Sequence, residues 1–178
     1  MSVFKFKKFS ILQSKSAMKV GTDGVLLGSW VNCQNAKKIL DIGTGTGLIS
    51  LMLAQRNNYC NITAVEIDKE TSEEANININ NSKWRDRISI INISINNFTT
   101  SKKFDFIVSN PPYFPANYSK NKRAIARHTN LLSFQDLIRT TVKLLSSKGI
   151  FAVILPKIAE VTFCKTANAN KLFLIRIC

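Results

Sequence analysis

A glycine-rich turn between a strand pattern and a helix pattern constrains the fold of this sequence most strongly. Residues 38–42 form a short apolar run, glycines follow at 43, 45 and 47, and residues 48–55 have a helical pattern. Glycine adopts backbone dihedrals that other residues avoid, and it lets the backbone come close to a ligand. A strand, a glycine turn and a helix in this order therefore predict an α/β fold with a ligand site at the turn.

Strand and helix patterns continue to alternate along the rest of the chain. Further strands are predicted at 62–65, 88–93, 104–108, 149–155 and 172–177, and further helices at 69–81, 134–145 and 157–169. This alternation is typical of a mainly parallel, Rossmann-like sheet with helices on both faces, and ligands bind such sheets at the carboxyl ends of the strands. A chain of 178 residues has room for one such domain.

The residues before this pattern predict an extension in front of the core. Residues 3–11 place Phe and Ile among Lys and Ser, which predicts an extended segment, and Thr22 or Asp23 is expected to cap the helix that follows. The single domain, residues 1–178, is thus divided into an N-terminal extension, residues 1–36, and a core, residues 37–178. Because the chain ends on an apolar run with nothing to cover it, we expect a truncated core that lacks its final strand.

The glycine spacing and a later acidic residue narrow the class of ligand. The spacing is GxGxG, whereas a dinucleotide fingerprint needs GxGxxG and a phosphate-binding P-loop ends in Gly-Lys-Ser/Thr. This difference disfavours NAD and FAD. Glu66 ends the next predicted strand, about 20 residues beyond the glycines, where a carboxylate can accept hydrogen bonds from two ribose hydroxyls. Asp68 is expected to cap the helix after it.

A third motif, Asn110-Pro111-Pro112-Tyr113, follows the strand predicted at 104–108. The two prolines fix the backbone and supply carbonyl groups without N–H donors. The amide oxygen of Asn110 and the carbonyl of Pro111 can accept the two hydrogens of an exocyclic amine, and Tyr113 offers a flat face for stacking. The motif therefore predicts a planar substrate whose amine nitrogen acts as the nucleophile.

The composition indicates the partner and the compartment. Lys and Arg number 25 against 11 Asp and Glu, and the net charge of +14 favours a polyanionic partner, most simply a nucleic acid. The four Cys lack a CxxC spacing and the chain has one His, which argues against a zinc site and a disulfide framework and favours the cytoplasm. No apolar run approaches the ~20 residues of a membrane helix. We expect a monomer without a metal.

Taken together, residues 41–47, Glu66 and residues 110–113 resemble the motifs of class I S-adenosylmethionine-dependent methyltransferases of the amino-methylating NPPY group. The resemblance covers nearly the whole chain. Within that group, residues 16–30 and 126–128 are similar to the bacterial tRNA1(Val) adenine-N6 methyltransferases, which modify the adenine 3′ of the anticodon. The resemblance implies S-adenosylmethionine as the cofactor and tRNA as the substrate.

The resemblance also implies which residues bind the cofactor. The segment around residues 19–24 would close over the methionine end, and Glu66 would hold the ribose. Ser94 or a neighbouring backbone group would replace the acidic residue that usually contacts the cofactor adenine, because residues 92–96 contain no acid. The implied cofactor-binding residues are Lys19, Thr22, Asp23, Gly24, Asp41, Gly43, Gly45, Gly47, Glu66, Ser94 and Asn110.

The implied catalytic residues are Asn110, Pro111, Pro112 and Tyr113. An adenine in an RNA loop has to leave its stack to react, and Tyr113 and Phe114 are the residues expected to stack on it. Basic residues just downstream are expected to contact RNA phosphates; these are Lys120, Lys122, Arg123 and Arg127.

Three alternatives stay open. A protein-glutamine N5-methyltransferase also uses an NPPY pocket, but such enzymes usually carry a helical N-terminal domain, and only 36 residues precede the core here. Adenine methylation of ribosomal RNA or DNA is disfavoured only by the narrower resemblance. An RNA-binding module without a cofactor would fit the charge, but it would leave residues 41–47 and 110–113 unexplained.

Overall fold

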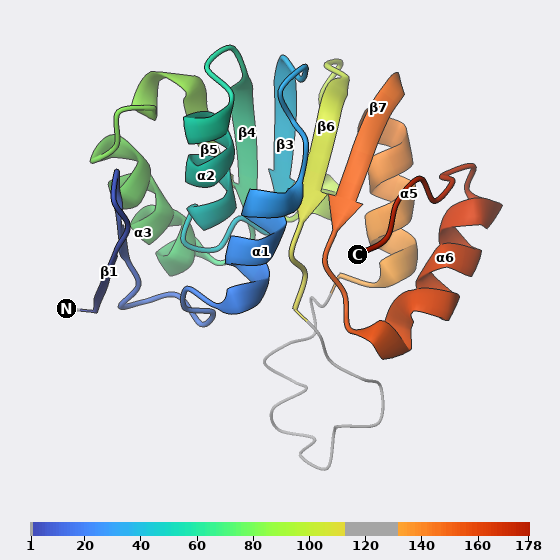
Figure 1. Cartoon of the computed structure of the whole chain (residues 1–178), viewed down its shortest axis with the longest axis horizontal. Coiled ribbons are helices and arrows are strands. Elements are labelled where there is room, and N and C mark those ends of the chain that lie inside the picture. Colours follow the sequence, from blue (N-terminus) through green and yellow to red (C-terminus); the bar gives the residue numbers. More distant parts are fainter. Residues whose placement is uncertain (1, 113–131) are drawn as a thin grey trace.

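The computed structural model describes residues 2–112 and 132–178, and its centre is a five-stranded sheet (Figure 1). The strand order is β5-β4-β3-β6-β7, and every neighbouring pair is parallel. The bounds are Lys38–Ile42 for β3, Asn61–Glu66 for β4, Ile88–Asn92 for β5, Phe104–Ser109 for β6 and Leu145–Val153 for β7. The chain builds outward from β3 to β5 and then returns to the other side of β3 for β6 and β7. The predicted Rossmann-like sheet is confirmed.

Helices cover both faces of this sheet, as the sequence pattern predicts. One face packs against α1 (Thr22–Trp30), α2 (Leu48–Arg56) and α3 (Lys69–Asn80), and the other against α5 (Phe134–Leu144) and α6 (Glu160–Ala169). Successive strand residues point to opposite faces, so Ile39 belongs to the first core and Leu40 to the second. Because a strand buried on both faces needs apolar residues at nearly every position, β3 reads as an apolar run in the sequence.

A small antiparallel hairpin stands beside the main sheet. β1 (Val3–Lys5) pairs with β2 (Ser10–Leu12), so the extended conformation predicted for residues 3–11 is confirmed for both strands. The Phe6 ring stacks on Phe9, with 4.6 Å between the ring centroids. The ring of Phe9 also contacts the edge of Trp84, near the start of β5, and this contact ties the hairpin to the core. Single 3-10 turns complete the chain: η1 (Arg85–Arg87), η2 (Ile95–Asn97) and η3 (Lys157–Ala159).

The start of α1 differs from the prediction. The residue in the N-cap position is Gly21, with an extended backbone, and no side chain caps the helix. Thr22 and Asp23 lie inside the first turn, one and two residues past the N-cap position. The prediction that one of these two residues caps α1 was therefore wrong.

Residues 172–177 also differ from the prediction, because they do not form a sixth strand. They have no regular secondary structure, and the side chains of Phe173 and Ile175 are 73% and 82% exposed. A strand is completed by hydrogen bonds to a neighbouring strand, and an apolar run alone does not supply them. This segment instead contacts α1, where the Arg176 guanidinium lies 4.0 Å from the centroid of the Trp30 ring.

Candidate active site

The glycine turn after β3 presents open backbone at the carboxyl end of the sheet. Gly43, Gly45 and Gly47 have φ values of +68°, +58° and +82°, which favour glycine strongly over any residue with a Cβ. A Cβ added at Gly43 or Gly45 would meet no other atom within 4 Å, whereas one at Gly47 would contact Ile79 on α3. The first two glycines thus border open space, and the third packs against the protein.

The Asp41 side chain stabilises this turn from inside the protein. The residue is fully buried, and its Oδ2 accepts hydrogen bonds of 2.7 Å from both Thr44 Oγ1 and Ser50 Oγ. Its Oδ1 is buried without a hydrogen-bond partner among the described residues. Burial raises the pKa of the Asp41 carboxyl to about 6, against the opposing effect of the two hydroxyl hydrogen bonds. Asp41 therefore shapes the turn; it does not itself line the cavity next to it.

The raised pKa of Asp41 predicts a specific pH dependence of stability. The folded protein keeps the Asp41 proton up to about pH 6, whereas the unfolded chain releases it near pH 3.8. The stability due to this proton is complete below pH 3.8 and is lost as the pH rises through about 6. Between pH 4 and pH 7, the free energy of unfolding of the wild type should fall relative to that of Asp41→Asn, by on the order of 3 kcal/mol. Urea unfolding of both proteins across this range measures the difference, and parallel curves would contradict the assignment.

Glu66, at the end of β4, holds the other side of the turn. Its Oε2 accepts the Gly45 N–H at 2.9 Å, and its Oε1 accepts the Asp68 N–H at 3.0 Å. An ionised carboxylate offers about four acceptor positions, so these two bonds leave capacity for the hydroxyl groups of a ribose. The predicted ribose contact stays a prediction. The cap predicted for α3 is confirmed, because Asp68 Oδ1 accepts the Thr71 N–H. Hydrogen bonding by the Thr71 side chain and, to a lesser extent, by its backbone N–H lowers the pKa of Asp68.

A cavity of about 160 Å³ lies between the glycine turn and the chain that leads into α1. It brings together seven of the residues predicted to bind the cofactor: Lys19, Thr22, Asp23, Gly24, Gly43, Gly45 and Asn110. Six further lining residues were not among the individual residues predicted to bind the cofactor, although Gly21 lies in the segment expected to close over it: Met18, Gly21, Thr44, Thr46, Leu48 and Ile49. Four predicted residues, Asp41, Gly47, Glu66 and Ser94, do not line it. Asp41, Gly47 and Glu66 belong to the glycine turn or support it, so Ser94 is the one predicted residue of these four that is connected neither to the turn nor to the cavity.

Asn110 enters the cavity from the end of β6. The preceding residue, Ser109, donates a 2.9 Å hydrogen bond from its Oγ to the Ile42 carbonyl, which fixes the end of β6 beside the end of β3. A Cβ added at Gly24 would lie 3.1 Å from the Leu48 side chain and 3.8 Å from Asn110 Nδ2, so the first turn of α1 passes close to both. Pro111 is buried and Pro112 exposed. The residues predicted to contact the substrate, Tyr113, Phe114, Lys120, Lys122, Arg123 and Arg127, lie outside the described residues.

The loop after β5 is held by a residue that the sequence did not single out. Asn92 donates from its Nδ2 to the backbone carbonyls of Glu66, at 2.9 Å, and Ile67, at 3.1 Å. Ser94 follows it, half-buried, and its carbonyl accepts the Asn97 N–H. Asn92 thus joins the ends of β4 and β5, next to the place where the resemblance implies contact with the cofactor adenine.

A larger cavity, of about 400 Å³, lies elsewhere, between the hairpin and the helices α1 and α2. Phe6, Phe9, Met52 and Arg56 are among its lining residues, and none of the three motifs reaches it. The larger of these two cavities is therefore not the one that contains the motif residues. Among residues 2–112 and 132–178, no three His, Cys, Asp or Glu side chains come together as metal ligands, and no helix is long and apolar enough to cross a bilayer.

A parallel sheet in the order β5-β4-β3-β6-β7, with an open glycine turn after β3, an acidic residue at the end of β4 and Asn-Pro-Pro after β6, defines a class I methyltransferase. The chain belongs to the methyltransferase small domain family, whose model matches residues 12–163. It is accordingly an enzyme, and its methyl donor is S-adenosylmethionine.

Solved structures of other methyltransferases share the fold. A precorrin-6y C5,15-methyltransferase from Geobacter metallireducens superposes with a TM-score of 0.64 at 11% identity, over 90% of this chain and 77% of that one. A predicted O-methyltransferase from Agrobacterium tumefaciens also gives 0.64, at 21% identity, over 83% of this chain and 68% of that one. At these identities the likeness concerns the fold alone.

Curated relatives are much closer in sequence. One from a Flavobacteriaceae bacterium (strain 3519-10) is 48% identical over 99% of this chain and 76% of its own length. One from Trichodesmium erythraeum is 52% identical over 86% of this chain and 66% of its own length. Both are named tRNA1(Val) (adenine(37)-N6)-methyltransferase.

Proposed function

We propose that this protein transfers the methyl group of S-adenosylmethionine to the N6 amine of an adenine in tRNA, the adenine 3′ of the anticodon of tRNA1(Val). The observation that carries the proposal is that Asn110 and the open glycine turn line one cavity, so an amine acceptor and a cofactor can meet there. The names of the relatives support the choice of tRNA and of adenine, and so does the net charge of +14.

The described residues suit S-adenosylmethionine. Gly43 and Gly45 leave space for a ligand to approach the backbone closely. Lys19 and Asp23 bring one cation and one anion to the same cavity, which matches the carboxylate and ammonium of an amino-acid end. Glu66 stands at the end of β4 with acceptor capacity for a ribose. When bound, the cofactor supplies a methyl group on a sulfonium sulfur, already activated for transfer.

Asn110 and Pro111 supply the groups that act on the substrate amine. The lone pair of an adenine amine is delocalised into the ring, which makes the nitrogen a weak nucleophile. Acceptors at the Asn110 side chain and the Pro111 carbonyl hold the two amine hydrogens and favour the form in which the lone pair is localised on nitrogen. Holding that nitrogen in line with the methyl group supplies several kcal/mol more. The amine proton leaves after the methyl group has arrived, so no strong base is needed.

The proposal includes the organisation of the chain. Residues 1–178 act as one methyltransferase domain, in which residues 1–36 close over the cofactor. The protein works as a monomer in the cytoplasm, where unmodified tRNA is available. Tyr113 and Phe114 stack on the target base, and Lys120, Lys122, Arg123 and Arg127 contact the RNA phosphates.

Transfer of labelled methyl to unmodified tRNA1(Val) tests the proposal. The expected product is N6-methyladenosine, identified by digestion of the tRNA and chromatography. A matched transcript with guanosine in place of the target adenosine should stay unlabelled. Ribosomal RNA, DNA and a glutamine-containing protein extract serve as competing acceptors. Label in one of these and not in tRNA would reject the tRNA assignment, and label in the guanosine transcript would reject the target position.

A further inference from the structure

One wall of the cavity is made by a segment with no regular secondary structure, held in place from outside the cavity. This strap, residues 13–21, runs from β2 to α1. Met18, Lys19 and Gly21 of the strap line the cavity, opposite the glycine turn. A segment of this kind keeps one conformation only if its backbone N–H groups find fixed partners.

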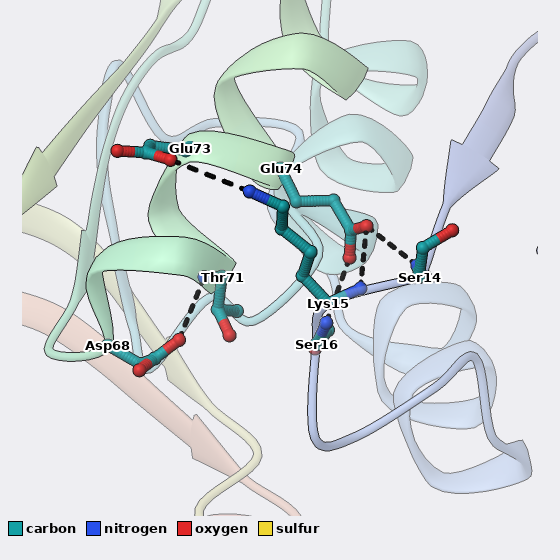
Figure 2. A network of polar contacts seen from close by, with 7 residues as sticks. All are labelled: Ser14, Lys15, Ser16, Asp68, Thr71, Glu73 and Glu74. Atoms are coloured by element: carbon teal, nitrogen blue, oxygen red, sulfur yellow. Dashed lines mark hydrogen bonds and ion pairs between the residues drawn. The ribbon is translucent and has the colours of Figure 1, made fainter. Parts of the chain in front are cut away.

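Glu74 of α3 supplies those partners. Its carboxylate is 1% exposed and accepts three successive N–H groups of the strap: those of Ser14 and Lys15 on Oε1, at 2.6 and 2.9 Å, and that of Ser16 on Oε2, at 3.0 Å. Figure 2 shows the carboxylate pointing from the helix to the strap backbone. Burying a carboxylate is costly unless it is fully hydrogen-bonded. The three N–H groups therefore stabilise the buried carboxylate, and the carboxylate in turn fixes the backbone of the strap.

The neighbouring glutamate behaves differently, although the sequence gives no reason to separate the two. Glu73 forms an ion pair of 3.8 Å with the Lys15 side chain, and both side chains are about half exposed (Figure 2). An exposed pair of this kind contributes little. Glu73 therefore contacts the same strap as Glu74 without fixing its backbone.

Contacts within the strap carry this restraint to the cavity. Ser16 donates from its Oγ to the Met18 carbonyl at 3.0 Å. Gln13 accepts the Val20 N–H on its Oε1 at 2.8 Å. Ser16, which Glu74 holds, and Gln13, at the start of the strap, are thus bonded to the residues on either side of Lys19, which lines the cavity.

The same helix also holds the opposite wall. Asn78, one turn after Glu74, accepts the Leu12 N–H at 2.7 Å and donates from its Nδ2 to the carbonyls of Leu12 and Thr46, each at 2.9 Å. Thr46 belongs to the glycine turn and lines the cavity. The strap and the turn are therefore both fixed to α3.

We propose that Glu74 is a positioning residue for cofactor binding: it fixes the strap to α3, and so sets the separation between the strap and the glycine turn before the cofactor arrives. The inference rests on the assignment of this cavity to S-adenosylmethionine in the proposed function. It does not depend on which RNA is methylated.

Three variants of the full chain test the inference. Glu74→Ala removes all three acceptor contacts, and Glu74→Gln keeps the shape and one carbonyl oxygen. Glu73→Gln is the matched control, because it breaks the ion pair on the same helix and the same strap. If the strap of Glu74→Ala is in place a tenth of the time, the Kd for S-adenosylmethionine rises about 10-fold. We expect a rise of that size or more in calorimetry for Glu74→Ala, a smaller rise for Glu74→Gln, and no change for Glu73→Gln.

Hydrogen exchange without the cofactor gives a second, independent result. In the Glu74 variants, the amides of Ser14, Lys15, Ser16 and Val20 should exchange faster, while those of β3 and β4 stay protected. Faster exchange throughout the sheet would show a general structural role and overturn the inference, as would unchanged affinity in folded Glu74→Ala. Where Glu74→Ala does not fold, Glu74→Gln decides in the same way. A wild type that fails to bind S-adenosylmethionine would instead reject the proposed function.

Discussion

Replacing Asn110 with alanine is expected to slow methyl transfer about 100- to 1,000-fold, the usual cost of losing one preorganised hydrogen-bonding group that acts on the reacting atoms. The affinity for S-adenosylmethionine should stay within a few-fold of the wild-type value. The reason is geometric: Asn110 follows β6, whereas the strap and the glycine turn form most of the cavity wall. Single-turnover transfer to tRNA and calorimetric titration of the cofactor measure the two quantities separately.

A matched asparagine provides the control for this experiment. Asn97, in η2, is exposed and lies outside the cavity, so Asn97→Ala should change neither rate nor affinity. An equal loss of transfer and of cofactor affinity in Asn110→Ala would show that Asn110 serves the cofactor alone. That outcome would refute its role toward the substrate amine.

Replacing Gly45 with alanine is expected to raise the Kd for S-adenosylmethionine at least ~10-fold, or about 1.4 kcal/mol. The added Cβ would extend into the open space beside the turn, where no protein atom lies within 4 Å and where the cofactor is proposed to bind. The positive φ of +58° adds backbone strain of roughly 1–2 kcal/mol, which lowers stability. Calorimetry and urea unfolding measure the two effects.

The variant Gly47→Ala distinguishes the effect of backbone strain from the effect of contact with the ligand. Its φ is +82°, so Gly47→Ala carries comparable strain, but the new Cβ would lie 3.5 Å from Ile79 inside the protein. Gly47→Ala should therefore lose similar stability and keep cofactor affinity within a few-fold. Equal affinity losses in both variants would mean that strain in the turn, and not the space above Gly45, governs binding.

Much of the fold could be predicted from the sequence because its signals are local. The apolar run of β3, the glycines after it and the cap at Asp68 each depend on neighbours within a few residues, and all three are confirmed. The predicted cap of α1 and the predicted sixth strand were wrong because a local pattern fixes neither the first residue of a helix nor the partner of a strand. The N-cap position of α1 lies one or two residues before the predicted ones, and the apolar run at 172–177 does not pair with a strand.

The parts of the site that the sequence did not reveal depend on distant contacts. Glu74 reads as one of several glutamates near the start of a helix, and only the fold brings it to residues 58 to 60 positions earlier. Glu66 was correctly placed at the end of its strand, yet its hydrogen bonds to the Gly45 and Asp68 N–H groups need the folded turn. Asn92 gave no signal at all, because a single asparagine at the end of a strand is common.

The order of the strands has a consequence for how such an enzyme can acquire new acceptors. The glycine turn, Glu66 and α3, which shape the donor pocket together with the strap and the start of α1, come from the half of the sheet between β3 and β5. The groups that meet the acceptor begin after β6, on the opposite side of β3. The two halves meet along the pairing of β3 with β6, and Ser109 is bonded to Ile42 at its carboxyl end. Sequence drift in the second half can therefore redirect the enzyme to another amine while the donor half stays intact, so one ancestral scaffold can give rise to enzymes with unrelated acceptors.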